Sequence, residues 1–336
     1  MNRPTHALLV DQRLHGFAAG MQRDLEAAVV RRTGAVTIPA PDPWPLRLVR
    51  RYTAAGTRYA GLAAMVPRRS FPIPCGELWV VAMGPPDFPL WYYRGWDRDA
   101  SRTRLYLFDT FEFQLPTLRR LLAAGRWDQL ITSFPAAVPV LQGATGRRWQ
   151  AVLQGVDLAR FHPLPAGTEP VIGFSSYGRK LPAVHSAVAA FAARVGVNFD
   201  FTVASGLDPA FDPRDNYQSY AWHLRQSWFT VSWPVEVTHP SRAGSFSPVT
   251  CRWFEAAASG TVVIGAAPTD PAFEAAFGPG FVEQLDPDAP PDKLHARLAE
   301  LWDRRYELRA KRLTLAAERS HKWTWDERVI EMERGL

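Results

Sequence analysis

The segment RWFEAAASGTVVIG, residues 252–265, combines the pattern of a helix with that of a buried strand. Alanine and bulky apolar side chains recur in its first half, and Gly260 then stands where helices commonly end. The run that follows, residues 261–265, is apolar and rich in β-branched side chains, as in a strand buried on both faces. We therefore expect a helix over 249–259 and a strand over 261–265. A helix that leads directly into such a strand is typical of a parallel sheet covered by helices.

The same alternation of strands and helices extends outward from this segment in both directions. In the second half we expect strands at 171–174, 198–204 and 228–233, helices at 181–194, 215–226 and 270–277, and a helical tail from 291 to about 334. In the first half we expect strands at 6–10, 36–38, 77–83, 104–108 and 129–131, and helices at 17–32, 46–65, 114–124 and 135–142. The stretch 150–168 between the two series is rich in proline and turns, so we predict domains at 1–165 and 166–318.

Length and composition exclude several classes of protein. The 336 residues suffice for two domains, and 47% hydrophobic with 12% aromatic residues exclude a mainly disordered chain. We find no apolar stretch of about 18 residues and no apolar core of a signal peptide near the N-terminus. Two cysteines, Cys75 and Cys251, cannot build a disulfide framework. We therefore expect a cytoplasmic protein.

Three segments between residues 155 and 265, together with the ending of the chain, carry a family resemblance. The first reads GVDLARFHP at 155–163, the second IGFSSYGRK at 172–180, and the third is the segment 252–265. In this order they resemble the retaining GT-B glycosyltransferases, and they are most similar to the branch of the spore-maturation (CgeB-type) proteins. The ending HKWTWDER at 321–328 is similar to the close of that family's last helices. The resemblance covers about 110 residues of the second half, whereas the first half matches only in layout.

The resemblance implies both a fold and an activity. The fold would be an α/β GT-B fold, with two Rossmann-like domains facing each other across a cleft and a C-terminal helix, residues 319–336, returning to the N-terminal domain. The activity would be that of a metal-independent hexosyltransferase, which moves a sugar from a nucleotide-diphosphate sugar to a hydroxyl of a natural product, a glycan or a lipid-linked acceptor. The nucleotide sugar is then a co-substrate, and no further cofactor is expected. A non-catalytic nucleotide-sugar-binding protein and a sugar-nucleotide epimerase remain as alternatives.

The resemblance also implies a donor site in the second domain. A ribose diol requires a strong acceptor, for which the Glu255 carboxylate is suited, and a diphosphate requires fixed cations such as Arg179 and Lys180. Backbone amides of the turn 246–252 would face the phosphates. The donor-binding set is Arg179, Lys180, Ser247, Thr250, Arg252, Glu255 and Gly260. Each role has a structural alternative: a solvated Glu255 or one paired with Arg252, an ordinary basic turn at 179–180, and a plain helix cap at Gly260.

Two departures from the family concern the donor sugar and the first loop. Many members carry a glutamate, facing the donor sugar, at the position where this chain has Ser247. Recognition of the sugar is therefore left open by the sequence. The family's glycine-rich loop after the first strand is replaced by DQRLHG at 11–16.

Acceptor and catalytic residues are expected at the carboxyl edge of the first sheet, where open parallel sheets bind ligands. His15 follows the first strand and Asp109 follows the strand 104–108, the layout of the base and its partner in inverting GT-B enzymes. A retaining enzyme needs no such base, because the donor phosphate takes the acceptor proton. We expect acceptor contacts from Glu112, Trp91 and Trp96, with core packing as the alternative for the aromatic rings. Asp97-Arg98-Asp99 matches a metal motif of another glycosyltransferase fold, but we expect no metal here.

The charge of the chain is unevenly spread. Residues 1–165 carry 21 basic and 12 acidic side chains, against 18 and 21 in the remainder, and the expected helix 46–65 is rich in arginine. These arginines could attract an anionic membrane or a phosphorylated acceptor, or simply form a solvated basic helix. The expected location is therefore cytoplasmic, with a peripheral contact to the inner membrane as an option. No nucleic-acid-binding module is recognisable, so we expect no nucleic acid partner.

Overall fold

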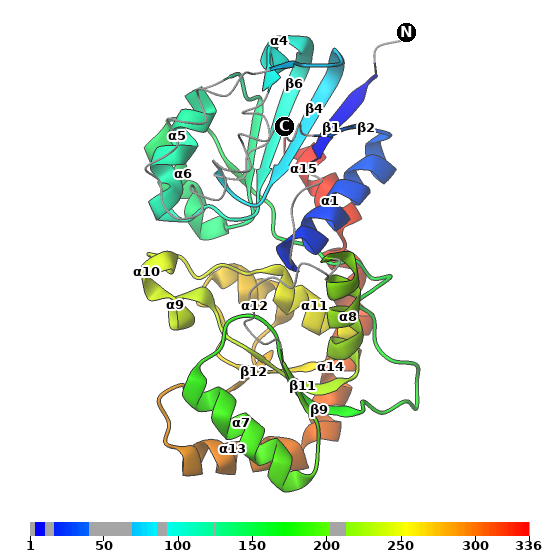
Figure 1. Cartoon of the computed structure of the whole chain (residues 1–336), viewed down its shortest axis with the longest axis vertical. Helices are drawn as coiled ribbons and strands as arrows, with labels where there is room; N and C mark the ends of the chain where they lie inside the picture. The colour runs from blue at the N-terminus through cyan, green and yellow to red at the C-terminus, as the bar shows by residue number, and fades with distance from the viewer. Residues whose placement is uncertain are drawn as a thin grey trace. The chain divides into compact units, whose positions relative to one another are not determined.

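A computed structural model describes residues 4–10, 17–39, 69–85, 93–123, 125–201 and 213–335 (Figure 1). The chain forms two compact units, one made of residues 1–153 with 328–336 and the other of residues 154–327. The proline-rich stretch after residue 153 thus belongs to the second unit. Each unit contains a parallel sheet covered by helices, which confirms the predicted α/β class.

The first unit is built on six parallel strands. Its elements are β1 (His6–Val10), α1 (Phe17–Thr33), β2 (Val36–Pro39), β3 (Arg69–Ser70), β4 (Cys75–Ala82), β5 (Tyr93–Arg94), α4 (Trp96–Asp99), β6 (Ala100–Leu107), η4 (Glu112–Gln114), α5 (Leu115–Ala123), β7 (Gln129–Thr132), η5 (Pro135–Ala137), α6 (Val138–Thr145) and β8 (Gln150–Ala151). The sheet order is β2-β1-β4-β6-β7-β8, and β3 pairs with β5 separately. Figure 1 shows α5 and α6 on one side of the sheet and α1 on the other. The central strands are therefore buried on both faces, as their apolar sequences predict.

The second unit has five parallel strands in the order β10-β9-β11-β12-β13. Its elements are β9 (Ile172–Ser176), α7 (Pro182–Val195), β10 (Phe199–Phe201), α8 (Pro213–Arg225), β11 (Ser227–Ser232), α9 (Val235–Thr238), α10 (Pro240–Ala243), α11 (Cys251–Ser259), β12 (Val262–Gly265), α12 (Pro271–Phe277), β13 (Val282–Gln284), α13 (Pro291–Asp303), α14 (Arg305–Arg319) and η6 (Ser320–Trp323), followed by α15 (Trp325–Arg334). Within the described ranges, no helix has the length and apolar character needed to cross a membrane.

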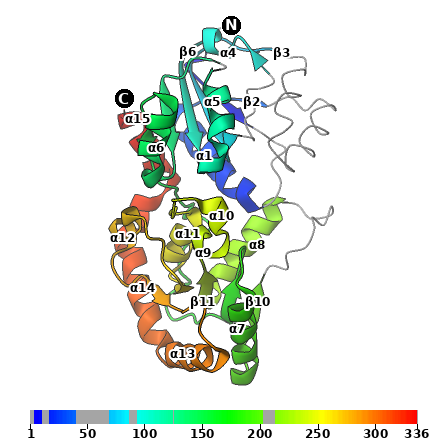
Figure 2. The same cartoon turned by 90° about the vertical axis from the view of Figure 1, so that its left-hand side faces the viewer.

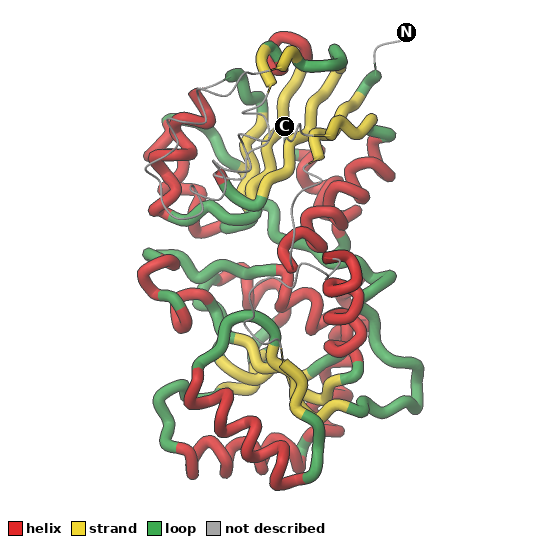
Figure 3. Tube along the Cα trace, in the orientation of Figure 1, coloured by secondary structure: helices red, strands yellow, loops and turns green. Residues whose placement is uncertain are grey.

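The core of the second unit lies between its sheet and the paired helices α7 and α13. Phe174 of β9 and Phe229 of β11 stack with ring centroids 5.3 Å apart, and Phe191 of α7 meets Phe174 edge-on at 5.8 Å. Leu294 and Leu298 of α13 complete this cluster. Figure 2 shows α7 and α13 side by side, and Figure 3 shows the sheet between them and the group α8, α11 and α14.

The predicted helical tail, residues 291 to about 334, is interrupted, so the prediction of one tail was too coarse. After α14 the chain forms the short turn η6, and Thr324 is extended before α15 begins. This break has a partner in the first motif, because the N–H of Val156 donates to the Trp323 carbonyl at 2.9 Å and Val156 bridges Thr324. Gly155 lies so close to the Trp325 ring that a Cβ would be 2.9 Å from it. The glycine of this motif therefore admits the start of the last helix.

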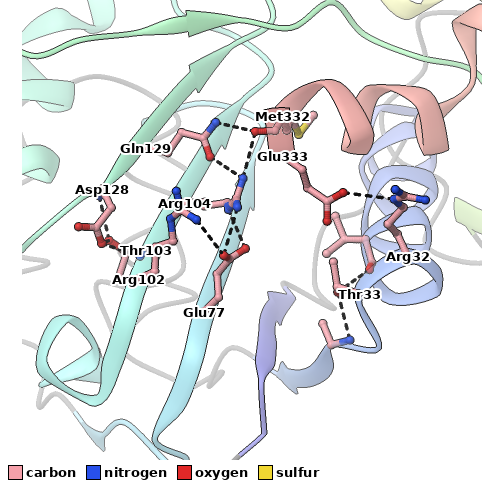
Figure 4. A network of polar contacts seen from close by, with 12 residues as sticks. Arg32, Thr33, Glu77, Arg102, Thr103, Arg104, Asp128, Gln129, Met332 and Glu333 are labelled. Atoms are coloured by element: carbon pink, nitrogen blue, oxygen red, sulfur yellow. Dashed lines mark hydrogen bonds and ion pairs between the residues drawn. The ribbon is translucent and has the colours of Figure 1, made fainter. Parts of the chain in front are cut away.

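The end of α15 is held in the first unit by a buried polar network (Figure 4). Arg104 of β6 lies in ion-pair contact with Glu77 of β4, with Nε 2.6 Å from Oε1, and its side chain is only 5% exposed. Arg104 Nη1 also donates to the Met332 carbonyl at 3.0 Å, and Gln129 Nε2 donates to the same oxygen at 2.7 Å. Two side chains of the sheet thus satisfy a carbonyl that the helix end leaves without an internal donor.

We predict that Arg104→Ala destabilises the chain far more than Arg102→Ala. Arg102 contacts the same Glu77 carboxylate at 3.7 Å, but its side chain is 37% exposed. Removing Arg104 leaves Glu77 buried without its close partner, which typically costs about 3–5 kcal/mol, whereas an exposed pair contributes about 1 kcal/mol or less. Urea unfolding followed by tryptophan fluorescence measures both variants. Equal shifts of the midpoint would contradict this account of the network.

Candidate functional site

The strand order of the second unit points to one edge of its sheet. The chain leaves β9 to one side for β10 and then crosses to the other side for β11, so the order reverses between β9 and β11. Open parallel sheets bind ligands at the carboxyl ends of the strands beside such a reversal. The loop that follows β9 at this edge contains Gly178, Arg179 and Lys180, the second motif of the sequence. The topology therefore places the predicted phosphate-binding cations where a ligand is expected.

Gly178 joins this loop to the segment 252–265. Its φ is +91°, a conformation that side chains rarely adopt. A Cβ at this position would also lie 2.7 Å from Nη2 of Arg252, so the guanidinium packs directly against the loop backbone. The glycine is required both by its conformation and by the close approach of Arg252. The structure therefore brings the second and third motifs together.

Lys180 is half-buried beside an aromatic ring. Its ammonium lies 4.5 Å from the centroid of Phe201, and burial lowers the pKa of Lys180. His185 of α7 packs edge-on against the same ring at 4.6 Å. Its own burial, and then the charge of Lys180, lower the pKa of His185. A cation held partly out of water in this way interacts more strongly with an anion than a solvated lysine does.

Glu255 is buried, with 1% of its surface exposed, and each of its carboxylate oxygens accepts a hydrogen bond. The Tyr217 hydroxyl donates to Oε1 at 2.6 Å and the Tyr220 hydroxyl donates to Oε2 at 3.0 Å. Burial raises the pKa of Glu255, whereas the two tyrosine hydroxyls and Arg252 act in the opposite direction. The solvated alternative for Glu255 is therefore excluded. A carboxylate offers about four lone-pair positions, so two tyrosines leave further acceptor capacity.

The first motif supplies the packing beneath these tyrosines. Phe161 is fully buried, and its ring centroid lies 5.5 Å from that of Tyr217 and 5.7 Å from that of Tyr220. Its position is set by a turn in which the N–H of Phe161 donates to the Asp157 carbonyl at 2.9 Å. Phe161 therefore fixes the tyrosines that hold Glu255. All three motifs that carry the family resemblance thus meet around one carboxylate and one guanidinium.

The remaining donor-site candidates lie around α11. Thr250 is the N-cap residue of α11, yet its hydroxyl makes no capping hydrogen bond. Ser247 is 7% exposed and accepts a hydrogen bond from the Thr269 N–H at 2.7 Å. Gly260 ends α11 in the left-handed conformation, and a Cβ there would be 2.5 Å from Leu313. A cap and tight packing thus explain this glycine, while the donor roles of all three residues stay predictions.

The acceptor candidates of the first unit are only partly visible. Asp109 follows β6, and its N–H donates to the Met83 carbonyl at 2.6 Å, while half-buried Glu112 opens η4 at the same edge. Trp96 is 3% exposed and packs on Trp127 with ring centroids 4.6 Å apart, the core position considered as its alternative. His15 and Trp91 lie outside the described residues, as does the basic segment 46–65. The acceptor and catalytic roles therefore stay predictions.

A pocket at the opposite edge of the second sheet does not match the expected site. It has a volume of about 270 Å³ and is lined at the amino ends of β9 and β11 by Trp228, Trp302 and Tyr306. The Arg305 guanidinium lies 4.5–5.6 Å from the centroids of these three rings. The aromatic faces are thus already occupied by a cation of the chain itself. The carboxyl edge remains the candidate site.

Sequence reasoning did not find the tyrosines of α8. Tyr217 and Tyr220 are three residues apart in the predicted helix 215–226, so a shared face was readable from their spacing. The contact of this face with Glu255 could not be predicted, because Glu255 is 35 positions beyond Tyr220 in the sequence. Gln154, whose side-chain oxygen accepts from the first N–H of α11 at Cys251, was missed for the same reason.

Solved structures match nearly the whole chain, and two of them have TM-scores above 0.5. Sucrose-phosphate synthase from Thermosynechococcus elongatus gives a TM-score of 0.57 at 14% sequence identity, covering 99% of this chain and 98% of that one. The catalytic domain of starch synthase IV from Arabidopsis thaliana, bound to ADP and acarbose, gives 0.53 at 9% identity over 99% and 98% of the two chains.

The chain has the GT-B fold. No family model and no curated protein matches its sequence, so the similarity concerns the fold alone. The GT-B fold predicted from three short motifs is therefore confirmed, while the CgeB-type branch stays a prediction. In this GT-B chain the candidate donor site is the carboxyl edge of the second sheet, with the cations of the loop after β9, the start of α11 and the buried Glu255.

We predict that Glu255→Gln changes the pH dependence of stability in a defined direction. Because the pKa of Glu255 is raised in the folded chain, its contribution to stability is complete below about pH 4 and is lost as the pH rises through the raised value. Glutamine does not titrate, so the variant should gain stability relative to the wild type as the pH increases. Urea unfolding of both proteins between about pH 4 and pH 8 measures the difference. If the difference in free energy of unfolding between the two proteins stays constant with pH, the pKa of Glu255 is not raised in the folded chain.

Proposed function

We propose that this chain is a glycosyltransferase that moves a sugar from a nucleotide-diphosphate sugar to an acceptor hydroxyl. One observation carries the proposal: on a GT-B fold, Arg252 packs against Gly178 of the loop that bears Arg179 and Lys180, beside the buried carboxylate of Glu255. Cations and an oriented acceptor thus stand together at the edge where such sheets bind ligands. The acceptor would be a natural product, a glycan or a lipid-linked molecule.

The diphosphate would be bound by charge and by backbone amides. Arg179, Lys180 and Arg252 supply three cations around the Gly178 loop, and the start of α11 adds the positive end of a helix. Guanidinium groups suit phosphate because their donors match its oxygens in pairs. This set neutralises the negative charge that develops on the leaving nucleoside diphosphate. We therefore propose that the reaction needs neither a metal ion nor a further cofactor.

The ribose would be recognised by Glu255. An ionised carboxylate accepts stronger hydrogen bonds than a neutral group does, and a vicinal diol can donate to it twice. Tyr217 and Tyr220 orient the carboxylate, so it does not have to be arranged when the donor arrives. Burial strengthens each such bond because competing water is excluded.

In the proposed transfer, the acceptor oxygen forms a bond to the anomeric carbon, and the bond between that carbon and the diphosphate oxygen breaks. The electron pair of the broken bond leaves with the nucleoside diphosphate. The acceptor proton goes to His15, with Asp109 as its partner, if the configuration inverts, or to the departing phosphate if it is retained. A hexose is the sugar that the family resemblance favours. The peripheral membrane contact rests only on the positive charge of residues 1–165.

Incubation with a panel of UDP-, ADP-, GDP- and dTDP-hexoses, analysed by mass spectrometry with cell extract as acceptor source, tests the reaction. We expect release of one nucleoside diphosphate together with a hexose-bearing product or free hexose. Epimerised donor without released nucleotide would indicate an epimerase, and bound but unchanged donor would indicate a binding protein. Arg179→Ala should weaken donor binding by about tenfold or more, as loss of a charged hydrogen bond predicts. The control Arg194→Ala, at the far end of α7, should leave it unchanged.

The role of His15 is tested separately from donor binding. His15→Ala should abolish transfer, while calorimetric affinity for the donor stays within about twofold, because His15 belongs to the acceptor side. If His15 is the base, the product of the wild type, analysed by NMR, should have the inverted anomeric configuration. Full turnover by His15→Ala with retained configuration would show that His15 is not the general base. The acceptor proton would then be assigned to the donor phosphate.

A further inference from the structure

A second carboxylate lies at the carboxyl edge of the second sheet, after the strand between β9 and β12. β11 ends at Ser232, and the chain turns through Pro234 into α9, whose first turn carries Glu236. Because β11 is flanked by β9 and β12, the loop after it emerges beside the loop of Gly178 and beside the residues that follow Gly265. Glu236 thus comes from the middle of the edge that the donor is proposed to occupy.

Glu236 is held by the residue that stands in place of the family's sugar-facing glutamate. The Ser247 hydroxyl donates to Oε1 of Glu236, and the same hydroxyl oxygen accepts from the Thr269 N–H at 2.7 Å. Ser247 is buried, with 7% of its surface exposed. It therefore connects the loop after β12 to the carboxylate after β11. The position that lacks a carboxylate in the sequence is in contact with one in space.

The other oxygen of this carboxylate has unused acceptor capacity. Oε2 of Glu236 is shielded from water and makes no hydrogen bond to any residue within the described ranges. A carboxylate oxygen in such a position costs free energy until a donor satisfies it. The donors that a nucleotide sugar brings to this edge are hydroxyls, and two neighbouring ring hydroxyls match the two oxygens of one carboxylate. A carboxylate repels an acidic sugar and gains nothing from a deoxygenated one.

We propose that Glu236, oriented by Ser247, is the residue that recognises the donor sugar, and that the sugar is a neutral hexose with free ring hydroxyls. The carboxylate that many family members carry at position 247 is thereby supplied from α9. This inference rests on the proposed glycosyltransferase function. It adds the class of sugar and the group that selects it.

The test compares calorimetric affinities for UDP-, ADP-, GDP- and dTDP-glucose with those for the matching nucleoside diphosphates. For the nucleotide that the wild type binds, Glu236→Gln should lower the affinity for the glucose ester by about tenfold, because a charged acceptor for the sugar hydroxyls is lost. The affinity for the matching nucleoside diphosphate should stay within about twofold. The double variant Glu236→Ser with Ser247→Glu exchanges the two side chains. It should recover most of the affinity for the glucose ester that Glu236→Gln loses. The control Glu318→Gln removes an exposed carboxylate of α14 and should change neither affinity.

Two results would overturn the inference. Equal weakening of the glucose ester and the diphosphate by Glu236→Gln would place Glu236 outside sugar recognition while leaving the glycosyltransferase proposal intact. Failure of the wild type to bind any nucleotide of the panel would remove that proposal and this inference with it. Should Glu236→Gln not fold, Ser247→Ala answers the same question, because it keeps the Glu236 carboxylate but removes the hydrogen bond that orients it. This variant should lower only the affinity for the glucose ester, by a smaller factor. Equal or absent weakening by Ser247→Ala would also overturn the inference.

Discussion

The buried carboxylate of Glu255 is the constraint on which the rest of the second unit depends. A carboxyl group with 1% exposure is tolerable only when hydrogen-bonding partners surround it, and here two tyrosine hydroxyls and a neighbouring guanidinium serve that purpose. This requirement fixes α8 against α11 and gives Phe161 its place beneath the tyrosines. The GVDLARFHP motif, which is far from Glu255 in sequence, is therefore part of the same construction.

The topology of the sheet determines at which of its edges the residues of the candidate site lie. Within each unit, the order of the parallel strands reverses beside the first strand of its sheet, so the loops after the strands on either side of the reversal lie at one edge of that sheet. In the second unit the loop after β9 brings Gly178 to this edge, and the connection between β11 and β12 brings Glu236 and, at the start of α11, Arg252. The positive φ of Gly178 and the packing of the Arg252 guanidinium against it restrict these two residues. The hydrogen bond from the Ser247 hydroxyl restricts Glu236. The site is thus prearranged, which favours charge stabilisation without reorganisation during the reaction.

The fold was largely readable from the sequence because its signals are local. Short apolar runs at 78–82 in β4, 105–107 in β6 and 262–264 in β12 predicted these central strands, and Gly260 marked the end of α11 correctly. Local signals failed where a distant contact decides the structure. The break before α15 depends on Val156, and the short strand β13 (Val282–Gln284) depends on pairing with β12.

The site was less readable than the fold for the same physical reason. Glu255, Arg252 and the Gly178 loop were predictable because each lies within a short segment that resembles a family motif. Tyr217, Tyr220 and Glu236 were not found, since a tyrosine on a helix and a glutamate in a turn look like ordinary surface residues. Only the three-dimensional contacts show that these residues complete the environment of Glu255 and Ser247.

The most direct measurement is the calorimetric affinity of the wild type and Glu255→Gln for a nucleoside diphosphate and for its 2′,3′-dideoxy form. If the buried carboxylate binds the ribose diol, the wild type should lose about tenfold or more in affinity with the dideoxy compound, and Glu255→Gln should bind both forms about equally. An equal loss in both proteins, or no loss in the wild type, would contradict the account, because Glu255 would then only support the tyrosines of α8.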